Sequence, residues 1–314
     1  MKIKNRKIII PIVIVAALFL FPLMSPDAYF LSFLFTLFVY IALSESWNLI
    51  GGYAGYLSFG HVAFFGVGAY TAALLLIHFG LSPFYTCFVG GILAAILAAI
   101  FGYPCLRLKG PYFCIASLCL GLIMRLITIN LDFTGAMVGL WLPLPPSNAF
   151  FYEFMLALSL IIVLLTRRIE GTKFGLGLRS IREDEETAQT VGINATRLKL
   201  TALILSAFLV GIVGSIYAYY RTFIHPDHMF DTYMSIIIVV MALLGGSKSW
   251  LGPVIGAIIV TVIDQLLVAF TRIPSEACRM IFGLLLIFVI IFMPDGIASF
   301  ITGRRTPKKK EIST

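Results

Sequence analysis

Residues 84–106 read FYTCFVGGILAAILAAIFGYPCL and contain no charged residue. A helix of about 20 apolar residues crosses the hydrocarbon layer of a bilayer, so this stretch is long enough to span a membrane. The rest of the chain has the same character, because 60% of its 314 residues are apolar, 12% are charged and the mean hydropathy is +1.00. A soluble domain does not need so many apolar residues. We therefore expect an all-α, polytopic transmembrane helical bundle that forms a single domain over residues 1–314.

Similar apolar stretches, separated by charged residues or by Gly and Pro, predict about ten transmembrane spans. They lie near residues 8–24, 28–50, 62–79, 84–106, 112–131, 149–166, 199–220, 233–245, 254–270 and 277–293. The basic start and the first apolar stretch together resemble a secretory signal. No small-x-small cleavage site follows them, so we expect an uncleaved first helix.

The chain contains 23 Lys and Arg residues, which are distributed unevenly between the two sides of this arrangement. One side receives the basic N-terminus, Arg107 and Lys109, residues 167–199, Lys248 and the basic tail 303–314, whereas the other receives Arg221, Arg272 and Arg279. Cytoplasmic loops carry the excess of positive charge, so we expect both termini in the cytoplasm. The cations lie in gaps between apolar stretches, which argues against nucleic-acid binding despite a net charge of +8.

The cysteines show no pattern of metal binding or redox chemistry. No CxxC pair occurs, and no histidine lies at ligand spacing. We expect them to behave as small buried apolar residues, and we expect no metal or cofactor. They are Cys87, Cys105, Cys114, Cys119 and Cys278.

Two glycine-rich regions interrupt the predicted spans: GGYAGYLSFGHVAFFGVGAY at residues 51–70 and LLGGSKSWLGPVIGA at residues 243–257. Breaks at corresponding places in two halves of a transporter indicate discontinuous helices that line a substrate pathway. Close helix packing is the alternative explanation for the glycines. For His61, the alternative to ligand contact is a helix-end histidine that bonds a carbonyl. The pathway candidates are Gly51, Gly52, Gly55, Ser58, Gly60, His61, Gly66, Gly68, Gly245, Gly246, Gly252 and Pro253.

Few other ionisable residues fall within the predicted spans, and such residues are functional candidates. They are Glu45, His78, Arg125 and Asp264. Arg125 and Asp264 are candidates to pair with each other or with a neighbouring subunit, and His78 is expected near the outer interface. These residues do not form a relay through the spans, which argues against a proton-driven carrier.

The longest polar connection, residues 167–198, predicts a short helix at the inner membrane surface. Ser180 and Glu183 form a capping-box pattern, four acidic residues occupy positions 183–186, and Gly192 provides a stop. Asn194 or Thr196 then caps the next span. A helix of about ten residues is not stable alone. Because the acidic residues are repelled by anionic lipid, we expect a protein partner.

Five motifs, in order across about residues 40–300, resemble the permease subunits of branched-chain amino acid ABC importers, in particular the longer of the two permeases. They are GYLSFGHVAFFGVGAYTAALL, LRLKGPYFCIASLCLGLIMRLI, FGLGLRSIREDEETAQTVGINATRLK, ALLGGSKSWLGPVIGA and FMPDGI. The resemblance implies a bacterial inner-membrane protein that pairs with a sister permease. Its further implied partners are two cytoplasmic ATPases, a periplasmic or lipid-anchored solute-binding protein and membrane lipid.

The family's ATPase-coupling loop would fall within the polar connection, where Thr187 replaces a usual alanine. The resemblance together with the helix pattern assigns Ser180, Glu183, Glu185, Thr187, Ala188 and Gly192 to this loop. No GxxxxGK[ST] sequence is present, since GGSKS at residues 245–249 has the wrong spacing, so we expect a transport subunit without its own ATP site.

The cargo is left open by the sequence. Residues 133–140 read FTGAMVGL, where the family commonly has a TGG-containing, more polar stretch. Branched-chain amino acids are the first expectation, and urea, short amides or other amino acids are the alternative within the family. A stand-alone secondary carrier or channel is the alternative of another class. A membrane enzyme using His61, Glu45 or Asp264 is disfavoured because these groups are scattered.

Overall fold

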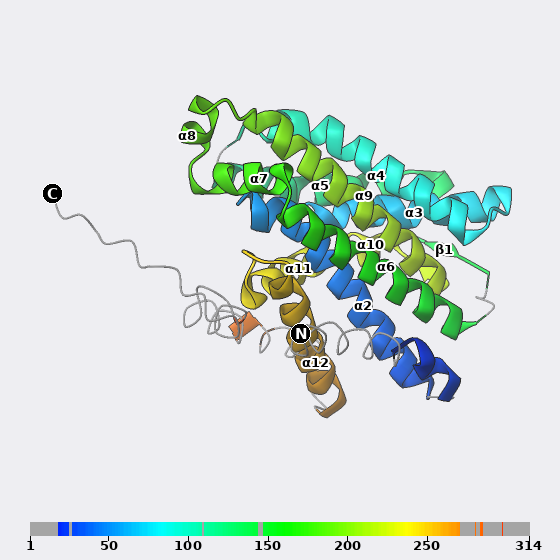
Figure 1. The fold of residues 1–314 in the computed structure, drawn as a ribbon. Coiled ribbons are helices and arrows are strands. Elements are labelled where there is room, and N and C mark those ends of the chain that lie inside the picture. Colours follow the sequence, from blue (N-terminus) through cyan, green and yellow to red (C-terminus); the bar gives the residue numbers. More distant parts are fainter. Residues whose placement is uncertain are drawn as a thin grey trace, which may run out of the picture.

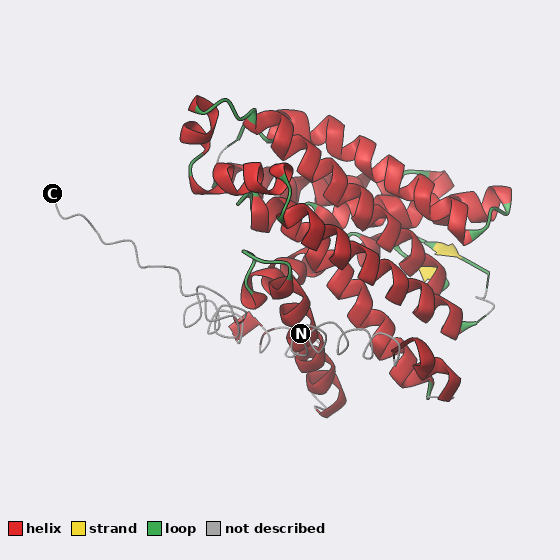
Figure 2. Cartoon of the chain, in the orientation of Figure 1, coloured by secondary structure: helices red, strands yellow, loops and turns green. Residues whose placement is uncertain are grey.

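The structure is a computed structural model that describes residues 18–24, 27–108, 110–143 and 147–270, together with the isolated positions 280, 283, 284 and 297. Most of the first predicted span, nearly all of the tenth, Cys278 and the basic tail 303–314 lie outside the described residues. The described part is almost entirely helical (Figure 2).

The helices follow the predicted spans closely (Figure 1). In chain order they are η1 (Phe21–Met24), α2 (Ala28–Asn48), η2 (Leu49–Tyr53), α3 (His61–Phe79), α4 (Pro83–Cys105), α5 (Pro111–Asn130), η3 (Asp132–Thr134), α6 (Asn148–Glu170), α7 (Lys173–Glu183), α8 (Glu185–Thr190), α9 (Ala195–Arg221), α10 (Pro226–Met229), α11 (Thr232–Gly245) and α12 (Leu251–Phe270). A short strand β1 (Leu140–Trp141) pairs antiparallel with β2 (Phe223–Ile224).

Within the described residues, seven helical segments are long and apolar enough to cross a membrane, and α12 adds a shorter apolar stretch over Leu251–Leu266. The seven include α2 continued through η2, and α10 continued into α11. The chain is therefore an all-α, multi-pass membrane protein. The expected total of about ten spans includes two that fall largely outside the described residues.

The centre of the bundle is α9, which packs against both α3 and α4. Small residues make this packing possible. Gly68 of α3 lies against the backbone of Gly211, and the Ser215 hydroxyl donates a hydrogen bond of 2.9 Å to the Gly68 carbonyl. In a membrane, helices associate through such close contacts because lipid is as apolar as their side chains.

The outward faces of α4 and α5 are apolar and exposed, as expected for a surface that meets lipid or another membrane subunit. The cysteine prediction needs one correction here. Cys87 is buried and Cys105 and Cys114 are partly buried, but Cys119 is exposed on α5 because it faces outward with the apolar side chains.

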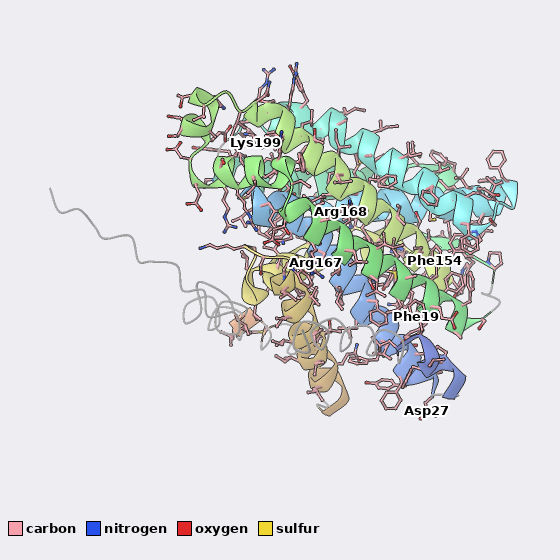
Figure 3. All side chains as sticks on the ribbon, viewed as in Figure 1. Phe19, Asp27, Phe154, Arg167, Arg168 and Lys199 are labelled. Atoms are coloured by element: carbon pink, nitrogen blue, oxygen red, sulfur yellow. The ribbon has the colours of Figure 1, made fainter. Side chains whose placement is uncertain are left out.

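The two ends of the bundle carry different elements. The end that carries α7 and α8, here called the α7 end, lies opposite the end that carries β1 (Figure 1). Arg167 and Arg168 near the end of α6 and Lys199 near the start of α9 all lie toward the α7 end (Figure 3). Phe154 lies farther along α6 toward the opposite end.

Candidate functional site

The polar connection contains two helices where the sequence predicts one. The Thr172 hydroxyl caps α7 by accepting a hydrogen bond of 3.3 Å from the Gly175 amide. Gly175 is needed because its Cα lies close to the Ile169 backbone, where a side chain would not fit. Leu178 and Ile181 bury one face of this helix.

The predicted capping box is therefore wrong. Ser180 lies inside α7, where its hydroxyl donates to the Leu176 carbonyl, and Glu183 is the last residue of α7. The cap of α8 is Asp184, whose Oδ1 accepts from the Thr187 amide at 2.9 Å. The physical reason is that the apolar face of α7 continues through residue 181, so the chain stays helical past Ser180.

The end of α8 agrees with the prediction. Gly192 adopts a positive φ of +90° and its amide donates to the Gln189 carbonyl at 3.0 Å, which ends the helix. Asn194 caps α9, since its Oδ1 accepts from the Arg197 amide at 3.0 Å. Ala188 is buried in a small apolar cluster with Ile181, while Thr187 is exposed.

A buried ion pair fastens α8 to the membrane helices. The Lys199 side chain is 3% exposed, and its Nζ lies 2.6 Å from Glu185 Oε1. Lys199 also donates to the Tyr56 hydroxyl at 2.7 Å and to the Leu106 carbonyl at 3.4 Å. The Tyr56 hydroxyl in turn donates to Glu185 Oε2 at 2.6 Å. We call Glu185, Lys199 and Tyr56 the α8 latch.

The latch keeps Tyr56 neutral. Burial raises the pKa of Tyr56 above its usual range, and the hydrogen bond and negative charge of Glu185 raise this pKa further. The Lys199 ammonium also lies over the Tyr56 ring, 4.4 Å from its centroid, which adds a cation–π contact.

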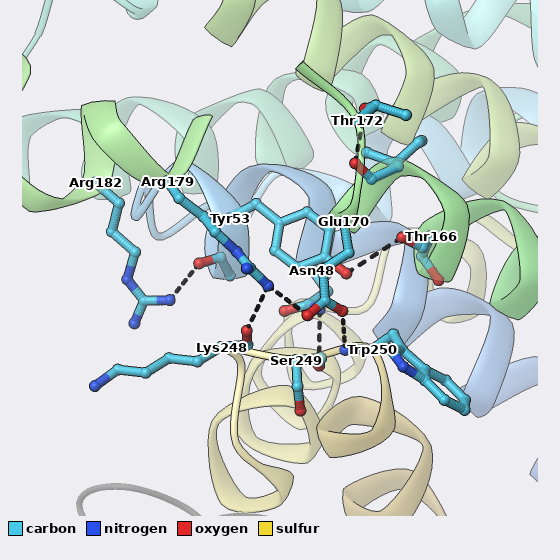
Figure 4. Close-up of polar contacts among 12 residues, drawn as sticks. Asn48, Tyr53, Thr166, Glu170, Thr172, Arg179, Arg182, Lys248, Ser249 and Trp250 are labelled. Atoms are coloured by element: carbon cyan, nitrogen blue, oxygen red, sulfur yellow. Dashed lines mark hydrogen bonds and ion pairs between the residues drawn. The ribbon is translucent and has the colours of Figure 1, made fainter. Parts of the chain in front are cut away.

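A second set of charged contacts fastens α7 (Figure 4). Arg179 forms an ion pair of 2.5 Å with Glu170 at the end of α6, and it donates to the Lys248 carbonyl at 3.1 Å. The other Glu170 oxygen accepts from the Trp250 amide at 3.1 Å. One turn farther along α7, Arg182 donates to the Gly52 carbonyl. We call Arg179, Arg182 and Glu170 the α7 clamp.

The surroundings of the clamp are partly shielded from water. Burial lowers the pKa of Arg182. The Arg179 guanidinium lies 5.6 Å from the centroid of the Tyr53 ring. Close by, the Asn48 side chain donates to the Ser249 carbonyl at 3.4 Å, which joins the end of α2 directly to the α11–α12 connection (Figure 4).

Both glycine-rich regions break the helices as predicted. The first break is residues 54–60, between η2 and α3, and the second break is residues 246–250, between α11 and α12. Gly55 at φ +77° and Gly246 at φ +108° take backbone conformations that other residues rarely adopt.

Most of the pathway candidates are buried in packing contacts. Gly66 lies against the Phe230 ring, and Gly245 lies against the Gly252 backbone where α11 and α12 meet. For Gly66, Gly68, Gly245 and Gly252 the structure therefore shows the close packing that was the alternative explanation. The other buried candidates are Gly51, Gly52, Ser58, Gly60, His61, Gly246 and Pro253, and Gly55 is exposed.

His61 is the first residue of α3, and its ring is held by a side chain. Its Nε2 lies 2.7 Å from the Ser206 hydroxyl, and that hydroxyl donates to the Ser46 carbonyl at 2.6 Å. The expected direct bond to a carbonyl is thus replaced by a bond through Ser206. Ser58 contributes its own carbonyl, which accepts from the Trp47 indole at 2.7 Å.

The ionisable residues of the predicted spans have different surroundings. Glu45 is fully buried on α2, and His78 is exposed near the end of α3. Arg125 pairs with Asp227 at 2.5 Å, which replaces the suggested pair with Asp264. The reason is that α5 packs against α10, whereas α12, which carries Asp264, packs against α2 and α11.

A pocket of about 630 Å³ opens at the α7 end, between the first break, the start of α5 and the junction of α7 with α8. Its walls combine apolar and charged side chains. They are formed by Ala54, Gly55, Tyr56, Leu57, Gly110, Pro111, Cys114, Ile115, Ile181, Arg182, Asp184, Glu185 and Glu186. In the described part of the chain, no three His, Cys, Asp or Glu side chains are grouped so as to hold a metal ion.

Sequence reasoning missed both the latch and the clamp. In the sequence, Lys199 is one more cation at the end of the polar connection, and Glu170 is one more charge near its start. A signal for α7 is present in the Thr172 cap and in the spacing of Leu178 and Ile181, but two glycines obscure it. The partners of these charges lie far away in the sequence and become visible only in the fold.

Comparison with known proteins identifies a family and relatives of this chain. Residues 29–290 match the family described as branched-chain amino acid transport system / permease component. The LivM permease of the high-affinity branched-chain amino acid transport system of Escherichia coli K12 is 29% identical over 82% of this chain and 67% of its own length. A LivM permease of Methanocaldococcus jannaschii is 26% identical over 87% of this chain and 94% of its own.

Among solved structures, a metal-chelate type ABC transporter in an inward-facing conformation is similar, with 18% sequence identity, a TM-score of 0.46 and coverage of 83% of this chain and 85% of that one. The family match extends over most of the described helices and includes both glycine-rich breaks and the α7–α8 segment. The chain belongs to the branched-chain amino acid transport permease family.

Proposed function

We propose that this chain is one of two membrane subunits of an ATP-driven importer for branched-chain amino acids, and that α7 and α8 receive the motion of a partner ATPase. The observation that carries this proposal is the α7–α8 segment itself, which protrudes from the bundle yet is fastened to it by charged contacts. The buried pair fixes the position of α8, because loss of either partner would leave an uncompensated buried charge.

The outward surface of α8 supports contact with a protein partner. Thr187, Gln189 and Thr190 are exposed, and Val191 at the tip is 77% exposed. Glu185 points inward into the latch. We infer that the partner ATPase contacts the exposed residues, while Glu185 keeps α8 in place.

The proposed orientation places the α7 end in the cytoplasm of a bacterial inner membrane, with both termini on that side. The basic residues at this end support it, because positively charged loops are retained inside. The sister permease, the two ATPases and an external solute-binding protein are the partners that this function requires. The chain itself is proposed to contribute no ATP site.

In the proposed cycle, closure of the ATPases on nucleotide displaces α7 and α8 as a unit. That displacement changes the arrangement of the helices at the two breaks and switches the pathway between outward-open and inward-open states. Such a switch needs only that each state makes different contacts with the ATPases and the solute-binding protein.

The test is reconstitution in liposomes with the sister permease, both ATPases and the solute-binding protein. We expect leucine, isoleucine and valine to stimulate ATP hydrolysis and to be taken up. Stimulation by urea or acetamide, and not by these amino acids, would identify the cargo as urea or a short amide. Uptake by this chain without the ATPases would overturn the proposal in favour of a stand-alone carrier.

A variant at the end of α8 tests the role of the segment. Proline fixes φ near −65° and has no amide hydrogen, so Gly192→Pro is incompatible with the φ of +90° and with the bond to Gln189. We expect normal membrane insertion and loss of ATP-driven uptake. Gly80→Pro is the matched control. Gly80 also ends a helix at positive φ, and its amide donates to the Leu76 carbonyl, but it lies after the C-terminal end of α3 and outside the α7–α8 segment. Full uptake by Gly192→Pro would contradict the role of the segment.

A further inference from the structure

Helix α7 contacts both glycine-rich breaks, although these breaks lie far apart in the sequence. Arg182 donates to the Gly52 carbonyl in η2, two residues before the first break, and its side chain lies against Gly55 within that break. Arg179 donates to the Lys248 carbonyl within the second break. The two arginines are three residues apart, so they lie on the same face of the helix. A displacement of α7 would therefore act on both regions through the hydrogen bonds from these side chains to main-chain carbonyls (Figure 4).

Glu170 fixes the position of Arg179 relative to the second break. One of its oxygens pairs with Arg179 at 2.5 Å and the other accepts from the Trp250 amide at 3.1 Å. Arg179 itself reaches the Lys248 carbonyl, two residues before Trp250. The second break is thus held at two adjacent points by one ion pair. A guanidinium suits this task because its rigid, planar fork fixes the direction of the two Nη2 hydrogens that serve both acceptors.

We propose that Arg179 and Glu170 are positioning residues through which α7 makes the two breaks change conformation together. This inference rests on the proposed function, because it concerns how the transport cycle is transmitted. Charge-assisted bonds are shorter and stronger than neutral ones, so the second break follows α7 as long as the pair is intact. Loss of Arg179 leaves Arg182 bonded next to the first break and detaches the second break from α7, although Glu170 and Asn48 still bond to that break.

The experiment uses the complete importer, with the five native cysteines of this chain replaced. Leu57→Cys reports on the first break and Lys248→Cys on the second, in separate variants, because both side chains are exposed. The rate of modification by a membrane-impermeant maleimide is measured without nucleotide and with ATP and vanadate. With Arg179 present, we expect ATP to change the rate at both positions.

In Arg179→Gln, we expect the ATP-dependent change to persist at position 57 and to shrink at position 248 by about fivefold, the size typical of coupling between residues in contact. Glu170→Gln is expected to act in the same direction. Arg179→Lys keeps the charge without the fork and should give an intermediate change. Lys173→Gln removes an exposed cation from the same helix and should change neither position. Uptake, assembly with the partners and thermal stability are measured for every variant.

Unchanged ATP responses at both positions in Arg179→Gln would overturn the inference. Equal loss at both positions would also overturn it, because Arg179 would then only hold α7 in place. A third result concerns the proposed function alone. If the wild-type complex shows no ATP-dependent amino acid uptake, the function fails regardless of Arg179, and the two failures are thereby distinguished.

Discussion

The α8 latch and the α7 clamp fasten neighbouring helices of one segment, but they do so in different electrical surroundings. In the latch, the side chains of Lys199 and Glu185 are 3% and 18% exposed. In the clamp, those of Arg179 and Glu170 are 36% and 21% exposed. The latch is therefore an interior ion pair, and the clamp lies at the boundary with water.

From this difference in exposure we infer that the latch attaches α8 and that the clamp transmits the motion of α7. Breaking a buried ion pair by removing one partner is costly because the remaining charge stays desolvated. A pair near the surface exchanges its bonds for bonds to water at little cost. The latch is suited to hold α8 permanently, whereas the clamp is suited to transmit the motion of α7 while its pair is intact and to re-form that pair readily after it opens.

The largest effect is expected for Glu185→Gln. The substitution removes the negative charge next to Lys199, which has almost no access to water. We expect the free energy that holds α8 in place to fall by about 3 kcal/mol, a factor of about 100 in the detached population. Limited proteolysis within residues 184–194 measures this population, since cleavage follows the population of the open form when opening and closing are fast.

Glu183→Gln is the matched control for that measurement. Glu183 carries the same charge two residues earlier, but it is exposed at the end of α7. Its proteolysis rate should stay near the wild-type rate. Equal proteolysis rates for Glu183→Gln and Glu185→Gln would show that the burial of the latch does not determine how firmly α8 is held.

Lys199→Met tests the same latch from the other side, with a smaller expected effect. The remaining carboxylate of Glu185 keeps the bond from Tyr56 and is 18% exposed, so water can partly solvate it. We expect a loss of about 2 kcal/mol in the same proteolysis assay. A greater loss for Lys199→Met than for Glu185→Gln would reverse the assignment of the buried partner.

The spans could be predicted because their length follows from the thickness of the membrane. The expected span 62–79 differs from α3 (His61–Phe79) by one residue at its start, and the expected span 112–131 differs from α5 (Pro111–Asn130) by one residue at each end. Helix α9 begins before the expected residue 199 because Asn194 caps it, and its polar first turn has no apolar signal. The stop at Gly192 was also readable, since glycine at a helix end is a local signal.

The latch and the clamp could not be predicted for a different reason. Helix α7 contains Gly175 and Gly177, which lower helix propensity, and its stability comes from packing against the bundle. The charged partners are brought together by tertiary structure, as Tyr56 and Lys199 are. The Arg125–Asp227 pair shows the same limit, because the packing of α5 against α10 selects it over Asp264.

Tyr56→Phe should weaken the latch less than either charge variant. It removes the hydroxyl that accepts from Lys199 and donates to Glu185, but it keeps the ion pair and the ring. We expect a loss of about 1 kcal/mol in the proteolysis assay.

The pKa of Tyr56 is raised in the folded protein, so ionisation weakens the fold only as pH rises past about 10, the value for an unfolded tyrosine. Between about pH 6 and pH 9 the difference from wild type should therefore stay constant, and a steep change in that range would show that Tyr56 ionises there.

Arg179→Gln should have the smallest effect on stability of the four variants, although it is expected to uncouple the second break. Arg179 and its partner Glu170 are both reached by water, so the lost ion pair should cost between about 0.2 and 1 kcal/mol. Unfolding by dodecyl sulfate in mixed micelles, followed by tryptophan fluorescence, measures the loss against wild type and against Lys173→Gln. High salt should narrow the difference further, because partly exposed charges are screened. If Glu185→Gln, measured in the same unfolding assay, lost no more stability than Arg179→Gln, the clamp would be as desolvated as the latch. Burial would then not distinguish the pair that attaches α8 from the pair that transmits motion.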